Sequence, residues 1–319
     1  METILKTKDI LQTLFPVRRS TAQKEAFRQW LMKELKRAGH KATEERYGKY
    51  NGSVNVVAGD PDRAVVFFVA HYDTPVRMLL PNYVSPTNPF FHVAYHFLVG
   101  VLLVLAAFVL SVAVTFPVDA PQLTFPLFVI FAVGGLLLSA YGKANKQNAN
   151  NNTSGVLALL SLARRLEKDE RVCFVFFDNN ERSLLGAKSF KKKHFTAASQ
   201  ALFIDFNCVG NGDELLLMPS KYSRWDDALL AALDDAFLVE GEKVTMPRVV
   251  SQGLVYYPSD CRKFKFHLAV AAGKKSAVGS YIPHLNSHKD TVLSCEIVSQ
   301  VVDGFARLLP LYFSEEEKV

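Results

Sequence analysis

Two long apolar segments near the middle of the chain constrain its fold most. No charged residue occurs in residues 97–116 or in residues 123–141. Each segment has about 20 residues, the length that a helix needs to cross about 30 Å of hydrocarbon. Neither segment has the polar face of a helix that is half-buried in a water-soluble core, which disfavours a pair of core helices. We therefore expect a transmembrane helical hairpin over residues 91–141, with spans of about 97–116 and 123–141.

The charges that flank the two spans predict their orientation. Arg77 precedes the hairpin, Lys143 and Lys146 follow it, and Asp119 is the only charge in the short connecting loop. Positively charged residues beside transmembrane helices stay on the cytoplasmic side. We expect an integral membrane protein with the lipid bilayer as a partner. Its connecting loop would lie outside, and its remaining parts and both termini would be cytoplasmic.

Composition limits the class of the remaining chain. Hydrophobic residues make up 49% and charged residues 21%, which are ordinary values for a globular protein and exclude disorder. The net charge of +6 is small and scattered, so we expect no nucleic-acid partner. The four cysteines are widely separated and are expected to be buried free thiols. The first residues lack the apolar core and cleavage site of a signal peptide.

Helical and strand-like segments alternate outside the hairpin. We expect residues 1–90 and 142–319 to form one discontinuous α/β domain, with a mostly parallel sheet sandwiched by helices. The predicted helices cover residues 20–38, 153–166, 183–193, 224–237 and 295–308. The predicted strands cover residues 53–58, 64–70, 172–177, 201–207, 214–218 and 266–272.

Polar motifs follow several of these strands. In an α/β sheet, ligands bind at the carboxyl ends of the strands. His71 and Asp73 follow the strand over residues 64–70, and such a pair suits a metal-binding imidazole oriented by a carboxylate. Five further motifs come later in the chain, at residues 150–155, 178–186, 205–210, 257–260 and 286–291.

In their order and spacing, these six motifs resemble those of the co-catalytic zinc aminopeptidases, metallopeptidase family 28. The resemblance is greatest to bacterial members with a membrane hairpin between the first two motifs, and it covers about residues 50–90 and 142–319. It implies a zinc aminopeptidase-like fold with two zinc ions bridged by an Asp and a water molecule. One zinc also binds a His and a later Asp, the other a Glu and a late His. A Glu just before the ligand Glu is the general base.

Part of this site is present in the chain. By resemblance, His71 and Glu181 correspond to metal ligands, and Asp73 to the catalytic Asp beside the ligand His. Asp260, in the fifth motif, corresponds to a residue of the substrate pocket.

Asparagine occupies the other positions. By resemblance, Asn151 stands where the bridging Asp is expected, Asn207 where the second Asp ligand is expected, and Asn286 where the late His is expected. Asn180 stands at the general-base position, where Glu is expected. An amide oxygen is a poor zinc ligand compared with a carboxylate or imidazole, and an amide cannot accept the proton. We therefore expect zinc binding to be weak or absent.

Two functions are compatible with these residues. The substitutions favour a membrane-anchored pseudopeptidase that binds a peptide or a protein partner. The alternative is an active zinc aminopeptidase with a rearranged metal site, in which His288 replaces a lost ligand. Asp205 cannot replace Asn207 in the same way, because two residues along a strand span about 6.6 Å. Whether the chain is an enzyme is therefore left open by its sequence.

Overall fold

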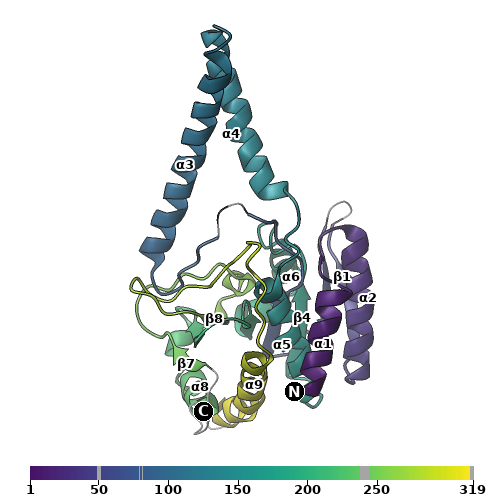
Figure 1. Cartoon of the computed structure of the whole chain (residues 1–319). Helices are drawn as coiled ribbons and strands as arrows, with labels where there is room; N and C mark the ends of the chain where they lie inside the picture. Colours follow the sequence, from purple (N-terminus) through teal and green to yellow (C-terminus); the bar gives the residue numbers. More distant parts are fainter. Residues whose placement is uncertain (49–51, 79, 81, 238–244, 317–319) are drawn as a thin grey trace.

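The computed structural model describes residues 1–48, 52–78, 80, 82–237 and 245–316 of the 319-residue chain. These residues form an α/β domain from which a long helical hairpin projects (Figure 1).

The sheet has eight strands among the described residues, in the order β1-β2-β4-β3-β5-β8-β6-β7. The strands β4, β3, β5 and β8 at its centre are parallel, whereas β1 and β2 pair antiparallel and β6 runs antiparallel to β8. Of these, β3, β4 and β5 are fully buried and are apolar apart from His71 and Asp205, as expected for a parallel sheet covered on both faces. The strand bounds are β1 Ala42–Arg46, β2 Val54–Ala58, β3 Val66–His71, β4 Val172–Phe177, β5 Leu202–Phe206, β6 Glu214–Pro219, β7 Met246–Val249 and β8 Phe266–Gly273.

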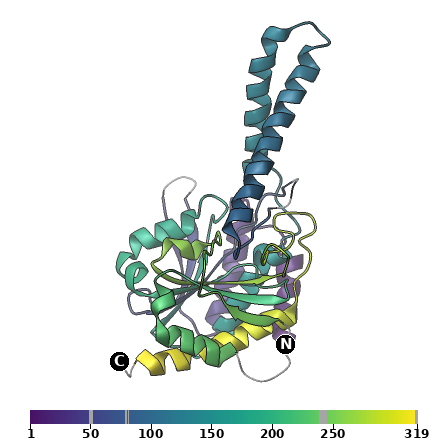
Figure 2. The same cartoon turned by 90° about the vertical axis from the view of Figure 1, so that its left-hand side faces the viewer.

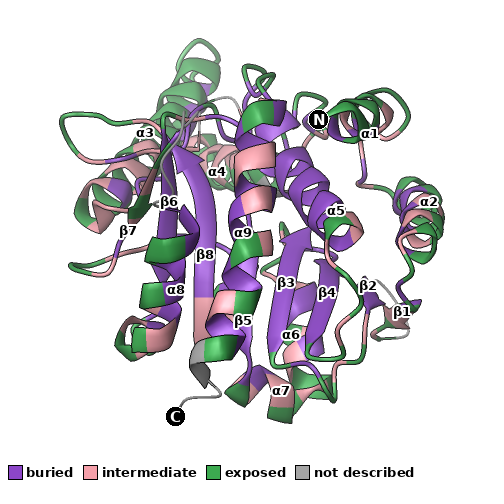
Figure 3. Ribbon diagram, turned by 90° about the horizontal axis from the view of Figure 1, so that it is seen from below, coloured by how far each residue is buried: buried purple, intermediate pink, exposed green. Residues whose placement is uncertain are grey.

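Helices cover both faces of this sheet (Figure 3). One face packs against α2, α5, α8 and α9, with α1 packed on α5 and α9, and the other face packs against α6 and α7. Phe68 and Ala70 of β3 face the first group, while Phe67 and Val69 face the second. The helix bounds are α1 Glu2–Thr13, α2 Thr21–Arg37, α5 Gly155–Arg165, α6 Leu185–Lys193, α7 Phe195–Gln200, α8 Asp227–Phe237 and α9 Cys295–Glu316.

The hairpin consists of α3 (Pro89–Thr115) and α4 (Thr124–Tyr141). The two helices approach one another at the distal end and separate toward the domain (Figure 1). Small residues of α3 are buried along this contact, and Thr115 Oγ1 lies 2.9 Å from Thr124 Oγ1. Both helices are long and apolar enough to cross a membrane, and their most apolar stretches are 11% and 0% buried.

The N-terminal end of α3 contacts loops of the α/β domain. The carbonyl oxygen of Tyr83 lies 3.1 Å from a ring nitrogen of both His92 and His96. The ring of His92 also contacts Tyr256, and the ring of Tyr83 stacks on Tyr281. The hairpin therefore leaves the domain from an aromatic cluster, and Figure 2 shows it extending away from one end of the sheet.

The predicted fold class is confirmed, with differences in detail. The strand over residues 172–177 and the helix start at Ser20, which caps α2, are found as predicted. The sequence did not predict α1, β1 or β7, and α9 continues to Glu316 rather than ending at residue 308. The acidic end of the sequence, residues 315–318, also predicts a solvated tail; its first two residues belong to α9, and residues 317–319 lie outside the described residues. All four cysteines are buried and free, as expected.

Candidate functional site

A cavity of about 230 Å³ lies at the carboxyl edge of the central strands. The parallel register pairs His71, the last residue of β3, with Phe177, the last residue of β4. The loops that follow these strands therefore start at the same edge. The cavity brings together six positions that the sequence singled out: His71, Asn151, Asn180, Glu181, Asn207 and Asn286.

His71 and Asp73 form a buried pair beside this cavity. Nδ1 of His71 lies 3.3 Å from Oδ1 of Asp73. Burial disfavours the charged imidazole, but the hydrogen bond and charge of Asp73, with the charges of Asp260 and Glu181, together raise the pKa of His71. Burial likewise disfavours the charged carboxylate, but His71, with the charge of Lys24 and the N–H group of Asn180, lowers the pKa of Asp73. A metal ion would therefore have to displace a proton from the pair to bind His71.

Asp73 also fixes the loop that follows β4. Its two carboxylate oxygens accept hydrogen bonds from the backbone N–H groups of Asn180 at 3.0 Å and Glu181 at 3.2 Å. Asn179, just before them, has a left-handed φ of 55°, a conformation that Asn tolerates better than most residues. Asp73 therefore holds Asn180 and Glu181 at the cavity, while the side chain of Glu181 remains exposed.

The side chains of the four asparagines at family positions all form hydrogen bonds within the protein, so they do not need a metal ion as a partner. Nδ2 of Asn151 donates to Oδ1 of Asn286 at 2.7 Å, and Nδ2 of Asn180 donates to Oδ2 of Asp260 at 2.8 Å. Oδ1 of Asn207 accepts a hydrogen bond from the Cys208 thiol at 3.1 Å. Each amide thus has a protein partner in this buried, polar site.

Hydrogen bonds hold the asparagine-rich loop before α5 against the carboxyl edge of the sheet. The carboxylate of Asp290 accepts from the backbone N–H groups of Asn150 at 2.8 Å and Asn151 at 3.0 Å. Nδ2 of Asn152 donates to the carbonyl oxygens of His71 and Phe206. Sequence reasoning did not assign this role to Asp290, although its place in the last motif was a usable signal. Of the loop's asparagines, Asn151 lines the cavity.

Two predicted residues lie away from the cavity surface. Asp260 is fully buried and lies behind Asn180, to which it is hydrogen-bonded, so it does not line the cavity as a substrate-pocket residue would. His288 is exposed and is absent from the cavity wall. Asp205 is fully buried as well and accepts a hydrogen bond from the backbone N–H of Cys261. The structure therefore does not bring His288 or Asp205 to the positions of the lost ligands.

The residues present do not fit a two-zinc centre. The described residues contain no group of three or more His, Cys, Asp or Glu side chains that could hold a metal ion. Of the five ligand positions, His71 and Glu181 carry side chains that zinc prefers. Two of the remaining positions, Asn151 and Asn286, are bonded to one another.

A second cavity of about 530 Å³ adjoins this site on the side of the hairpin. It is lined by Asp73 and Glu181 from the site and by Tyr141, the last residue of α4. Arg19 and Lys24 also line it, and Lys24 forms an ion pair with Asp178 at 2.6 Å. The membrane-spanning candidate α4 therefore ends beside the candidate site.

Comparison with known families agrees with this geometry. Residues 138–291, slightly less than half of the chain, match the family model of peptidase family M28. The resemblance to family M28 is thereby confirmed. No curated protein matches the sequence.

Solved structures similar to this chain are M28-type proteins. A Zn-dependent exopeptidase from Parabacteroides distasonis is 17% identical with a TM-score of 0.59, and the match covers 97% of each chain. The glutaminyl cyclase of Porphyromonas gingivalis is 16% identical with a TM-score of 0.56, covering 98% of each chain. The LapA aminopeptidase of Legionella pneumophila is 13% identical with a TM-score of 0.57, covering 99% of this chain and 71% of that one. At sequence identities this low, the structural similarity shows the fold alone.

Proposed function

We propose that this chain is a membrane-anchored M28-type pseudopeptidase, which binds a peptide in the cavity without hydrolysing it. The observation that carries the proposal is the hydrogen bond from Asn180 to Asp260. At the position of the general base, the chain presents an amide whose N–H₂ group donates to a buried carboxyl group. Such a side chain cannot take a proton from an attacking water molecule.

The ligand positions support the same proposal. A hydrolytic M28 site needs two cations to polarise the carbonyl group and lower the pKa of the bridging water. Here three of five ligand positions are neutral amides that already have protein partners. The cavity itself persists, and it offers amide, imidazole and carboxylate groups to a bound peptide.

The alternative is an active zinc aminopeptidase with a rearranged site. It requires a ligand besides His71 and Glu181, for which the sequence suggested His288. Because His288 is exposed and away from the cavity wall, its loop would have to move for it to reach the metal. The structure therefore favours the pseudopeptidase.

One set of measurements separates the two functions. Full-length protein in detergent is dialysed against zinc and its metal content is measured. Hydrolysis of aminoacyl anilides and cyclisation of N-terminal glutamine are then assayed, and peptide binding is followed by fluorescence anisotropy. We expect far fewer than two zinc ions per chain, no turnover above buffer, and saturable peptide binding. Zinc-dependent turnover that His71→Ala abolishes would overturn the proposal.

The membrane part of the proposal rests on the exposed apolar surfaces of α3 and α4. Large side chains such as Phe97 and Leu138 are about three-quarters exposed, at 73% and 72%. In water, this surface would be an aggregation hazard, whereas a bilayer covers it. The cavity would then lie near the cytoplasmic face of the membrane, because α4 ends at Tyr141 beside the site.

A topology measurement tests this placement. Reporters fused near Asp119 and at each terminus are compared in intact cells. We expect the loop reporter to be extracytoplasmic and both terminal reporters to be cytoplasmic, since Arg77, Lys143 and Lys146 flank the domain side of the spans. A cytoplasmic loop reporter on intact protein would contradict the proposed orientation.

A further inference from the structure

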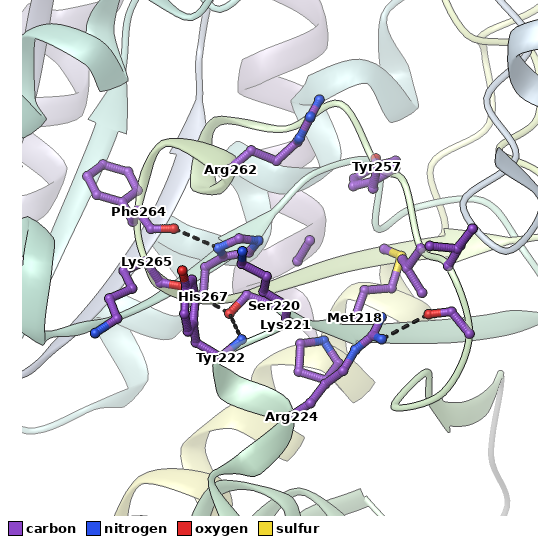
Figure 4. A pocket seen from close by; sticks show the side chains of 15 residues that line it. Met218, Ser220, Lys221, Tyr222, Arg224, Tyr257, Arg262, Phe264, Lys265 and His267 are labelled. Atoms are coloured by element: carbon purple, nitrogen blue, oxygen red, sulfur yellow. Dashed lines mark hydrogen bonds between the residues drawn. The ribbon is translucent and has the colours of Figure 1, made fainter.

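A cavity of about 420 Å³ lies on the face of β6 and β8 that points away from α8 and α9 (Figure 4). Met218 of β6 and Ala269 of β8 form part of its wall. The segment after β6, the loop that contains Gly253, and the segment before β8 provide the remainder. No family motif singled out this cavity, which we call the basic cavity.

The charges of the basic cavity all have one sign. Its wall includes Lys221, Arg224, Arg262 and Lys265, and no Asp or Glu residue lines it. Throughout the described part of the chain, no ion pair joins any of these four cations to a carboxylate. A concave surface lined by charges of one sign concentrates ligands of the opposite sign.

The cations are positioned by neutral groups. Nη1 of Arg224 donates to the carbonyl oxygen of Gly253 at 2.9 Å, as Figure 4 shows, while its Nε is buried and has no hydrogen-bond partner. The ammonium groups of Lys221 and Lys265 lie 4.8 Å and 5.3 Å from the centre of the Tyr222 ring. An aromatic ring attracts a cation but does not neutralise it, so the positive field of the cavity persists.

The basic cavity adjoins the candidate site. Tyr257 lines both cavities, and its hydroxyl group donates to the carbonyl oxygen of Asn207, a site residue, at 2.9 Å. Leu254 and Val255 add apolar surface to the basic cavity. An extended ligand that occupies the candidate site can therefore pass Tyr257 and place a neighbouring group among the four cations.

We infer that the basic cavity is the subsite for an acidic side chain of the bound peptide, an inference that rests on the proposed peptide-binding function. The apolar wall accommodates the methylene groups of Glu or Asp, and the cations bind the carboxylate.

The test compares peptides that differ only in this charge. Tetrapeptides with an uncharged coumarin amide at the C-terminus carry either Glu or Gln at position two, three or four. Their binding to the full-length chain in detergent is measured by fluorescence anisotropy at low and high salt. The variant K221Q/K265Q removes two exposed cations of the cavity, and K188Q/K192Q is the control with the same change in net charge on α6.

For at least one position, we expect the Glu peptide to bind more tightly than its Gln partner. Two partly exposed charges correspond to a preference of about five- to tenfold, which falls as salt rises. K221Q/K265Q should reduce this preference, with Arg224 and Arg262 left in the cavity wall, whereas K188Q/K192Q should retain it in full. Equal binding of Glu and Gln peptides would overturn the inference while the proposed function stands. Failure of every peptide to bind would overturn both.

Discussion

Nδ2 of Asn151 donates a hydrogen bond to Oδ1 of Asn286 across 2.7 Å, joining two positions at which the M28 resemblance implies metal ligands. The two residues are 135 positions apart in sequence and both are largely buried, at 7% and 6% exposed. In a metal centre, ligand side chains point at the ion and need no bond with each other. Here a direct amide–amide bond links the loop before α5 to the loop before α9, so the contact can hold the two loops together without an ion.

The first prediction concerns this bond. N151A and N286A should each lower the thermal stability of the chain, and their effects should be non-additive, with a coupling energy of about 1 kcal/mol. The coupling should be the same with and without a chelator, because the bond needs no metal. N286A combined with N55A is the control, since Asn55 is a buried amide that bonds Gly186 and Asp178 instead. A coupling that appears only with zinc would show that the two residues act through a metal ion.

The second prediction concerns the restoration of the family site. The triple variant N151D/N207D/N286H should bind more zinc than the unmodified chain, because it replaces neutral amides with ligands that zinc prefers. Peptidase activity should require N180E as well, since general-base catalysis contributes about 100- to 10,000-fold. Metal content and anilide hydrolysis are measured for each combination.

A matched control accompanies the restored variants. Asn82 lines the same cavity but corresponds to no ligand position, so N82D adds a carboxylate there without completing a metal site. N82D should not raise the zinc content. If the triple variant binds no more zinc than N82D, the correspondence between the asparagines and the metal ligands is wrong.

The sequence predicted the central sheet because its strands carry the strongest signals. β3, β4 and β5 are apolar apart from His71 at the end of β3 and Asp205 in β5, and the structure buries every residue of them. β1 is a polar edge strand, and β7 is a four-residue edge strand that contains a proline. Both have half-exposed patterns, which resemble loops in a sequence. Edge strands are fixed by pairing with a neighbour, and that pairing has no local pattern.

The sequence predicted the site residues that belong to a motif. It did not predict the contacts that join segments far apart in the chain. The order of the motifs was enough to single out His71 and Glu181, which the structure places at one cavity. It could not show that Asp290 holds the loop of Asn150 and Asn151, because that contact spans about 140 residues. Nor could it place Asp260 behind Asn180, or the basic cavity beside Tyr257, since both depend on how loops pack against β8.

The third prediction concerns the hairpin. The contacts that hold α3 on the domain lie at residues up to His96. Residues 97–138 can therefore be replaced by a Gly/Ser linker of about 12 residues, which spans about 20 Å. We expect a soluble domain with a cooperative unfolding transition by circular dichroism, because a surface insertion adds little closure entropy. Replacing residues 91–141 instead should lower stability, since His92 and Tyr141 are then lost. Aggregation of the shorter replacement would show that the hairpin is part of the folding unit.

The last prediction concerns the ion pair beneath the site. Nζ of Lys24, on α2, lies 2.6 Å from Oδ1 of Asp178, the residue after β4, and both side chains are almost fully buried. Burial raises the pKa of Asp178, and Lys24 opposes this shift. K24M leaves the carboxylate without its cation and should lower the free energy of unfolding by about 3–5 kcal/mol at pH 8.

The pH dependence of this variant follows from the raised pKa of Asp178. In K24M, the folded state should retain a proton on Asp178 at pH values where the unfolded state has lost it. Stability then falls as pH rises above the unfolded pKa of about 3.9, so the deficit of K24M should be smaller at pH 5 than at pH 8. K24M/D178N has no carboxylate at this position to protonate. It should recover part of the stability, and its deficit relative to the unmodified chain should be the same at pH 5 and pH 8. A deficit of K24M that is equal at the two pH values, as measured by urea unfolding, would show that Asp178 remains ionised without Lys24.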